Sequence, residues 1–408
     1  MRSTIPTIRR ASMLALMVVA TLATASLAAA PALFNFDRTL WVEDPSRPIP
    51  NLSPPAKGAR PLLSPAPHAS LAEKRVSSEP RARIEPAPLL EFPADPDCNS
   101  PCFWHEGQLH LFTSNQKPSR SVGSNLERLG APVPSVFDDG ARKLRWIEAV
   151  HLRDDGILFG LYHREEYLGE CPDREYFTVP DIGLARSRDL GRTWTDLGIV
   201  LQDYGISRSC DTPNKFFAGG VGDPSWAIDR VGGHAYIFFS SYTDPLSNQG
   251  VQVARLALGD LEAPIGNVWR WTGGGWDAPG LGGKGKPAVP ARVAWSDPKA
   301  DAFWGPSVHW NTYLGQHVVL VNRASDASWT QEGVYVFFAA DLSRPETFTP
   351  PRKLCNGGAW YCQVIGDAGM RGTDSLAGQS ARFFMKGKSR HRVVFEHPAA
   401  AAPAAGPE

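Results

Sequence analysis

Residues 187–194, which read Ser-Arg-Asp-Leu-Gly-Arg-Thr-Trp, constrain the fold of this chain more than any other stretch. The short polar side chains of Ser187 and Asp189 are suited to hydrogen-bonding the backbone of a tight turn. Gly191 supplies a backbone conformation that other residues resist, and Trp194 offers a large apolar side chain to anchor the following strand in a core. The stretch therefore predicts a hairpin between two β-strands.

The chain also repeats a unit made of a polar turn, a proline, a short apolar strand, a glycine-containing turn and a second apolar strand. Copies begin at residues 99–101, 222–225 and 305–307, a copy without the proline begins at Trp146, and residues 360–365 open a fifth. Short aromatic-rich runs separated by Gly, Pro and Asp favour an all-β fold. No long stretch has helical periodicity.

Five such units predict a five-bladed β-propeller. A six-bladed, sialidase-like propeller is the alternative, although the chain is short for it. The last blade, residues 360–395, supplies only three strands. We expect a strand near residues 89–92 to complete this blade and close the ring.

The ends of the chain differ in composition from its body. Residues 1–30 combine arginines with an apolar, Ala-rich run, which predicts a secretory signal peptide; an uncleaved membrane anchor is the alternative. Residues 31–93 are dense in Pro and Ala and are interpreted as a linker. The propeller is expected over residues 94–397 and a disordered tail over 398–408. The protein is therefore expected to be secreted or periplasmic, with no membrane insertion after cleavage of the signal.

Charge and cysteine content narrow the function further. Lys and Arg total 42, as do Asp and Glu, so the chain has no basic excess to attract nucleic acid. We expect a monomer.

The cysteines all follow the apolar run: Cys98, Cys102, Cys171, Cys210, Cys355 and Cys362. An even number in an exported chain predicts disulfides and no free thiols, with pairing of neighbours as the simplest scheme (98–102, 171–210 and 355–362). A metal site is less favoured, because neither a C-x-x-C nor an H-E-x-x-H motif is present.

Three carboxylates lie near the starts of predicted inner strands, where propeller blades line a central channel. They are Asp97, Glu148 and Asp223, from three different blades. Glycoside hydrolysis uses a pair of carboxyl groups, and a third shifts the pKa of its neighbour by like charge. The pattern therefore predicts a glycosidase site at one mouth of the channel. The structural alternatives are that Asp223 merely begins a strand and that Glu148 pairs with Arg145 or Arg323.

These features resemble known propeller families. Residues 187–194 look like the Asp-box of sialidase and BNR-repeat proteins. Together with residues 95–97 and 222–224, which enter the first and third blades, they resemble the five-bladed glycoside hydrolases of the arabinanase/β-xylosidase and invertase-like families. The resemblance covers the body of the chain by architecture and short motifs.

The resemblance implies roles for individual residues. Asp97 matches the base or nucleophile, and Asp223 matches the residue that modulates the acid or stabilises the transition state. The general acid is open between Glu148, on an inner strand of the second blade, and Glu332, on a later strand of the fourth.

Candidate substrate-binding residues are polar or aromatic side chains at strand starts or at the rim: Asn99, His163, Trp304, His309 and Gln363. A lone histidine is more often a hydrogen-bonded structural residue than a ligand. No cofactor is expected, but a structural calcium ion in the channel is an alternative, with His309 as its candidate support.

We therefore expect a secreted glycosidase that acts on a glycan or oligosaccharide. A non-catalytic propeller that binds carbohydrate or another partner is the alternative from a different class. An exo-sialidase is a further alternative; its chemistry needs three arginines and a tyrosine nucleophile, and no Arg-Ile-Pro segment opens this fold.

Overall fold

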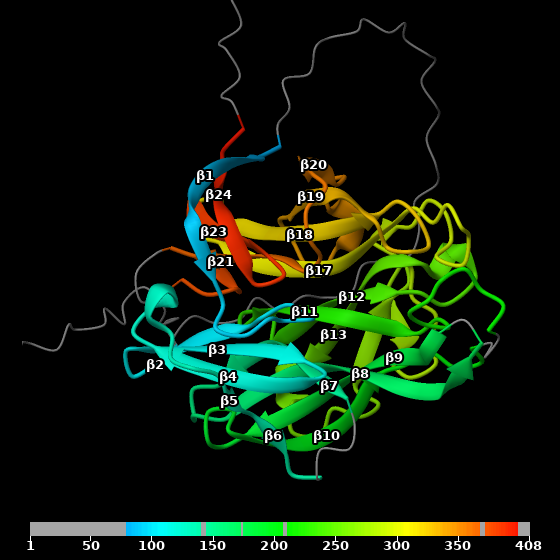
Figure 1. Ribbon diagram of the computed structural model, residues 1–408, viewed down its shortest axis with the longest axis horizontal. Coiled ribbons are helices and arrows are strands. Elements are labelled where there is room, and N and C mark those ends of the chain that lie inside the picture. The colour runs from blue at the N-terminus through cyan, green and yellow to red at the C-terminus, as the bar shows by residue number, and fades with distance from the viewer. Residues whose placement is uncertain (1–78, 140–143, 173, 207–209, 368–371, 399–408) are drawn as a thin grey trace, which may run out of the picture. The chain divides into compact units, whose positions relative to one another are not determined.

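Five separate β-sheets, arranged as the blades of a propeller, make up the structure (Figure 1). It is a computed structural model that describes residues 79–139, 144–172, 174–206, 210–367 and 372–398. The predicted signal peptide, most of the predicted linker and nearly all of the predicted tail lie outside these residues. Within the described residues, no helix has the length and apolar character needed to span a membrane.

The strands follow one another blade by blade. Blade one contains β2 (Cys102–His105), β3 (Gln108–Asn115), β4 (Lys117–Gly123) and β5 (Val133–Pro134). Blade two contains β6 (Val136–Phe137), β7 (Arg145–Leu152), β8 (Leu158–Cys171), β9 (Arg174–Ser187) and β10 (Thr193–Leu201). Blade three contains β11 (Val221–Asp229), β12 (His234–Ser241), β13 (Gly250–Ala257), β14 (Val268–Trp271), β15 (Trp276–Pro279) and β16 (Val289–Pro290).

Blade four contains β17 (Ala302–Asn311), β18 (Gln316–Ala324), β19 (Gln331–Ala339), β20 (Arg352–Asn356) and β22 (Leu376–Ala377). Blade five contains β1 (Arg81–Glu91), β21 (Cys362–Gly366), β23 (Ser380–Met385) and β24 (Lys388–Glu396). Short 3-10 turns lie at Leu126–Arg128, Leu246–Asn248, Leu258–Asp260 and Pro345–Thr347. The prediction of a five-bladed, all-β propeller is confirmed, and the six-bladed alternative is wrong.

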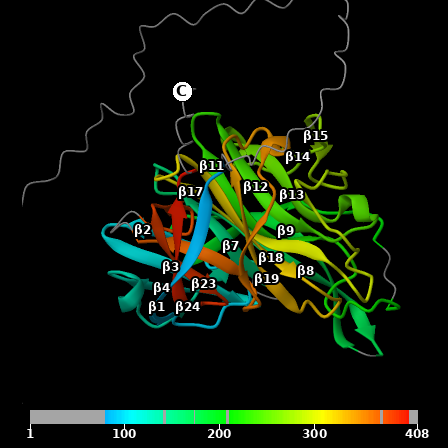
Figure 2. The ribbon, with the colours of Figure 1, turned by 90° about the horizontal axis from the view of Figure 1, so that it is seen from above.

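The N-terminal strand closes the ring. β1 pairs antiparallel with β24, so the two ends of the propeller lie side by side (Figure 2). The strand begins at Arg81, inside the segment interpreted as linker, and it extends further than the strand expected near residues 89–92. Ala82 and Ile84 pack against the core of blades four and five, which explains why this part of a Pro-rich segment is ordered.

Residues 187–194 form the predicted hairpin, between β9 and β10. The Asp189 carboxylate accepts hydrogen bonds from the backbone N–H of Thr193 at 2.9 Å and from its hydroxyl at 2.7 Å. Gly191 has a φ of 79°, a conformation that suits glycine. The Trp194 side chain is fully buried, and its indole N–H donates to Ser135 Oγ at 2.8 Å. The hairpin thus ties the outer strands of blade two to the core.

Hydrogen bonds across the channel hold the inner strands together. The Gln363 side chain of blade five accepts from the backbone N–H of Ser100 at 2.6 Å and donates to its carbonyl at 2.8 Å. The Asn99 amide donates to the Pro306 carbonyl of blade four at 3.0 Å. Asn99 and Gln363, both predicted to bind substrate, therefore join blades.

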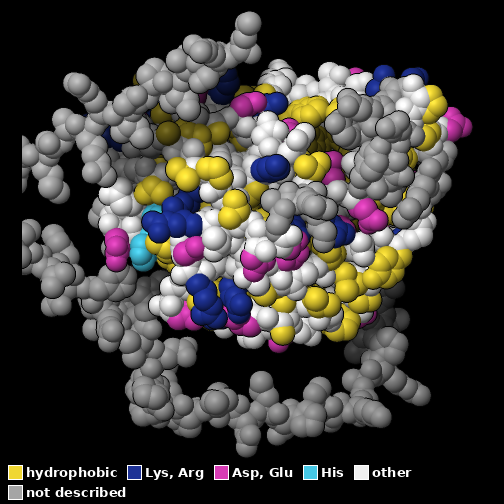
Figure 3. Space-filling view, turned by 60° about the horizontal axis from the view of Figure 1, so that its bottom comes forward, with side chains coloured by type: hydrophobic (Ala, Val, Ile, Leu, Met, Phe, Trp, Pro, Cys, Tyr) yellow, Lys and Arg dark blue, Asp and Glu magenta, His cyan; other side chains and the backbone are white. Residues whose placement is uncertain are grey.

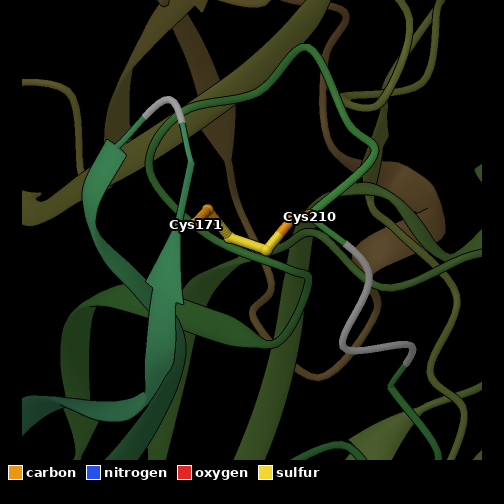
Figure 4. Close-up of a disulfide and its surroundings, with 2 residues drawn as sticks. All are labelled: Cys171 and Cys210. Atoms are coloured by element: carbon orange, nitrogen blue, oxygen red, sulfur yellow. A yellow bond between two sulfur atoms is a disulfide. The ribbon is translucent and has the colours of Figure 1, made fainter.

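The disulfide prediction is only partly confirmed. Cys171 and Cys210 form a disulfide that links the end of β8 to the connection between β10 and β11 (Figure 4). The pairings 98–102 and 355–362 are wrong, and so is the prediction of no free thiols, because these four cysteines are free.

The free cysteines serve as core residues. The Cys98 thiol donates to the Asn99 carbonyl at 3.1 Å, whereas Cys102 packs with the apolar residues of a separate cluster. Cys362 lies on β21 of blade five and Cys355 on β20 of blade four. Buried cysteines behave as small apolar side chains. An even number of cysteines therefore does not require that all of them form disulfides.

Thiol titration of the denatured protein checks this correction. Without reductant, four thiols are expected to react, because two of the six cysteines are in the disulfide. After reduction, six are expected. A count of zero before reduction contradicts the structure and restores the three-bridge scheme.

Candidate active site

Bulges on three inner strands position the polar residues of the channel mouth. The regular strand pairing is interrupted at Glu148 in β7, at Asp223 and Pro224 in β11, and at Gly305 and Pro306 in β17. A bulge leaves its extra residue unpaired and re-aims the side chain. Glu148 and Asp223 are therefore free of the strand ladders that surround them.

Asp223 adopts a backbone conformation that costs free energy. Its φ is 49°, and Gly305, at the corresponding point of blade four, has a φ of 56°. Glycine occupies this region without strain, whereas a non-glycine residue there is uncommon and such residues cluster at functional sites. An aspartate in this conformation is consistent with a chemical role.

His163 on β8 brings two of the carboxylates together. Its Nδ1 lies 3.4 Å from Glu148 Oε1 and 4.0 Å from Asp223 Oδ1. The backbone N–H of Asp223 also donates to this nitrogen at 3.2 Å. The Tyr242 hydroxyl donates a hydrogen bond to Asp223 Oδ2. Glu148 therefore pairs with His163 and with neither Arg145 nor Arg323.

Those two arginines have other partners. Arg145 forms ion pairs with Asp139 and Asp196, at 2.6 and 2.7 Å. Arg323 binds Asp301 at 2.7 Å. Both therefore act outside the channel mouth.

Burial dominates the electrostatics of the Glu148–His163 pair. Glu148 is 2% exposed and its Oε2 has no hydrogen-bond partner. Burial raises the pKa of Glu148, and His163 only partly opposes this. Burial disfavours the charge on His163, but the Glu148 carboxylate, then Asp223 and Glu165, outweigh it and raise the pKa of His163. Both groups therefore keep their protons to a higher pH than they do in water.

A cavity of about 310 Å³ lies beside this cluster. Its lining residues are Asp97, His163, Glu165, Pro180, Phe216, Phe217, Asp223, Tyr242, Trp304, Trp329, Trp360 and Tyr361. The volume is at the lower end of the range for small-molecule sites.

Strand alternation explains why Glu165 faces the cavity. Residues two apart on a strand share one face, so Glu165 lies on the same face of β8 as His163, and its Oε1 is 3.8 Å from His163 Nε2. Arg164, between them, turns to the other face, where its Nε donates to Asp181 at 2.9 Å. Burial raises the pKa of Glu165, which His163 partly opposes.

Burial also raises the pKa of Asp97. The positive charge of Lys386 acts against this shift, and the negative charge of Asp223 adds to it. Asp97 is placed by its own backbone N–H, which donates to the Ser114 carbonyl at 2.7 Å. Its backbone is therefore held to blade one, while its carboxyl group interacts electrostatically with Asp223 of blade three.

Aromatic rings from distant parts of the chain form much of the cavity wall. Trp304 has ring-centroid distances of 5.6 Å to both Trp360 and Tyr361. Phe216, on the connection that the Cys171–Cys210 disulfide tethers, contacts Trp360 edge-to-face at 5.7 Å. Phe217 stacks on Tyr242 at 4.1 Å. Trp, Tyr and Phe rings offer apolar faces to a bound ligand.

The structure brings together four of the nine predicted site residues at this cavity. Asp97, Asp223, His163 and Trp304 line it. Glu148 adjoins it behind His163 and is not part of its lining.

Glu332 and His309 lie elsewhere. Glu332 forms an ion pair with Lys353 and accepts a hydrogen bond from the Tyr335 hydroxyl at 2.9 Å, and its pKa is lowered. His309 is 1% exposed and packs against Phe395, and burial lowers its pKa to about 3. Neither residue lines the cavity. Glu332 is held by its charged neighbour Lys353, and His309 is surrounded by the core.

The sequence reasoning missed Glu165 as a catalytic candidate, and it missed Tyr242 and most of the aromatic wall. Apart from Glu332, the predicted catalytic residues lie near the first strand of each blade, whereas Glu165 lies on the second strand of blade two. The available signal was its spacing of two residues from His163, a residue already singled out.

Among the described residues, Glu148, His163 and Asp223 form the group that offers ligands for a metal ion, with ligand atoms all within 4.8 Å of one another. One imidazole and two carboxylates suit a transition metal better than calcium, which prefers oxygen ligands. The hydrogen bond from the Asp223 backbone already occupies His163 Nδ1. The fit to the calcium ion considered above is therefore poor, and a hydrogen-bonded cluster explains these contacts.

Replacement of Glu148 by Gln is expected to lower the pKa of His163. Burial alone lowers that pKa, and Glu148 is the main group that raises it. The histidine ring signals in an NMR titration measure the change. His317, whose pKa burial lowers to about 4, serves as an internal control that does not shift. An unchanged or higher pKa for His163 contradicts the described pairing.

The sequence matches no protein-family model and no curated protein. The fold is similar to several solved glycoside hydrolase structures. An exo-β-1,3-galactanase from Phanerochaete chrysosporium with galactose is 11% identical, with a TM-score of 0.44 over 74% of this chain and 60% of that one. This chain therefore spans less than two thirds of that galactanase.

An exo-1,5-α-L-arabinanase from a bovine ruminal metagenomic library is 13% identical, with a TM-score of 0.43 over 74% of this chain and 92% of that one. A GH43 endo-arabinanase from Bacillus licheniformis is 12% identical, with a TM-score of 0.42 over 74% of this chain and 95% of that one.

Proposed function

We propose that this chain is a glycoside hydrolase whose active site is the aromatic cavity. The observation that carries the proposal is the convergence of Asp97, Glu165 and Asp223 on one cavity from blades one, two and three. Glycosidases cleave with one carboxylic acid and one carboxylate on either side of the scissile bond. The aromatic wall supplies apolar faces against which a sugar ring packs.

Glu165 is the proposed general acid. A general acid must hold its proton near working pH, and burial raises the pKa of this side chain while it still lines the cavity. Glu148 also has a raised pKa, but it lies behind His163. Glu332 has a lowered pKa and is bound to Lys353. Only Glu165 among the three combines a raised pKa with access to a substrate.

Asp97 is the proposed base or nucleophile, and Asp223 is the proposed stabiliser of positive charge on the sugar in the transition state. Asp223 is suited to this role because the Tyr242 hydroxyl and its strained backbone fix its carboxylate. Fixed charges stabilise a transition state without reorganisation during the reaction. His163 positions Glu148 and Asp223 relative to each other.

We also propose that the protein is exported. The signal-like segment at residues 1–30 supports export, as does the Cys171–Cys210 disulfide, because disulfides persist in oxidising compartments. N-terminal sequencing of the protein recovered outside the cytoplasm should find a chain that starts near residue 31. An intact N-terminus in the cytoplasmic fraction contradicts export.

A screen of glycans and aryl glycosides tests the catalytic proposal. Hydrolysis is expected for at least one substrate and is measured as new reducing ends or released aryl alcohol. The triple variant Asp97→Asn, Glu165→Gln, Asp223→Asn is the matched negative control. Binding of a glycan at the cavity without any turnover supports the non-catalytic alternative instead.

A further inference from the structure

The charges around the cavity are unbalanced. Its lining includes two carboxylates, Asp97 and Asp223, the proposed acid Glu165 and one histidine, with no lysine or arginine. Glu148 adds a further buried carboxyl group directly behind His163. The positive charge of Lys386 acts on Asp97, but this lysine is not part of the cavity lining.

Two buried carboxylates elsewhere in the described structure have arginine partners. Asp181 is bound by Arg164, and Asp203 lies 2.9 Å from a guanidinium nitrogen of Arg270. A buried charge without such a partner costs free energy. On the face of the molecule in Figure 3, basic and acidic side chains are mixed. The cavity differs from both environments because its acids share a single histidine.

The wall of the cavity also favours a cation. Seven of its lining residues carry aromatic rings: Phe216, Phe217, Tyr242, Trp304, Trp329, Trp360 and Tyr361. The face of an aromatic ring attracts a cation through its quadrupole, most strongly for Trp, and such rings are used to bind ammonium groups. Carboxylates together with aromatic rings therefore complement a ligand that is positively charged and largely apolar in surface.

We propose that the cavity binds a sugar that carries a free ammonium group, so that the substrate is a glycan that ends in an amino sugar. This inference rests on the proposed function because it names the substrate class of the same site. The ammonium group compensates the carboxylates that have no arginine. The sugar ring packs on the aromatic wall.

Binding measurements with matched sugars test the inference without requiring turnover. Intrinsic tryptophan fluorescence reports binding, because three tryptophans line the cavity. Glucosamine and galactosamine are each compared at neutral pH with the parent sugar and with the N-acetylated sugar, which has no charge. The amino sugar is expected to bind at least about tenfold more tightly than either. Equal or weaker binding of the amino sugars, or no binding of them, overturns the inference.

Binding of tetramethylammonium measures the contribution of the cationic group without the sugar ring. This ion is expected to bind more weakly than the amino sugar, because it lacks the ring. Binding as tight as that of the amino sugar indicates a pocket for a simple cation and overturns the sugar assignment.

Two variants distinguish binding in the cavity from binding elsewhere on the surface. Asp97→Asn is expected to reduce the preference for the amino sugar, because it removes a carboxylate from the cavity lining, whereas Glu332→Gln, outside the cavity, is expected to retain it. Equal preferences in both variants contradict the assignment to this cavity. Amine-selective binding without hydrolysis of any glycan upholds the inference and rejects the hydrolase. Hydrolysis of neutral glycans without amine selectivity upholds the hydrolase and rejects the inference.

Discussion

Glu165→Gln is expected to lower kcat on glycans with poor leaving groups by about 10²–10⁴-fold, the usual loss when a general acid is removed. The glutamine keeps the shape of the side chain but has no acidic proton for the departing oxygen. The loss should shrink sharply for aryl glycosides with acidic leaving groups, which need little protonation. Steady-state kinetics over a series of aryl leaving groups measures this dependence.

Glu332→Gln is the matched control for that experiment. Glu332 makes an ion pair with Lys353 on the far part of blade four and does not line the cavity, so turnover is expected to stay close to wild type. If Glu332→Gln shows the leaving-group dependence and Glu165→Gln does not, the acid is Glu332. If Glu148→Gln alone shows it, the acid is Glu148.

Asp223→Asn is expected to lower kcat on every substrate by about 10²–10³-fold, whatever the leaving group. The substitution removes negative charge next to the sugar. Stabilisation of the transition state is therefore lost, whereas proton donation to the leaving group is unaffected. Asn tolerates a positive φ and retains an oxygen to accept the hydrogen bond from Tyr242. The fold should therefore persist, which thermal unfolding checks.

Asp229→Asn on the same strand provides the comparison for Asp223→Asn. Asp229 ends β11 and its side chain accepts a hydrogen bond from the backbone of Gly232, away from the cavity. Its turnover is expected to match wild type. Wild-type turnover in a folded Asp223→Asn protein contradicts the proposed role of Asp223.

The fold was predictable because its signals are local. The turn at residues 187–194 fixes its own geometry through Asp189 and Gly191, and the repeated units mark each inner strand. The start of β1 at Arg81 was not predictable to the residue, because the strand lies in a Pro-rich segment and is stabilised by pairing with β24. Such pairing depends on residues about 300 positions away.

The clearest predictions for the candidate site came from the starts of inner strands. Asp97 and Asp223 follow from their place before inner strands, and both line the cavity. The position of Glu165 could not be predicted in this way, because the direction of its side chain depends on the alternation of side chains along the second strand of blade two. Cys98 and Cys362 were misassigned because an even cysteine count does not distinguish core thiols from bridges.

A crystal structure of the Glu165→Gln protein with a bound oligosaccharide tests most directly whether the aromatic cavity is the active site. The terminal sugar is expected between residue 165, Asp97 and Asp223, with its scissile oxygen within hydrogen-bond reach of the residue 165 side chain. Sugar bound elsewhere, for example in the cavity of about 660 Å³ lined by Trp104 and Arg382, with the aromatic cavity empty, contradicts this assignment.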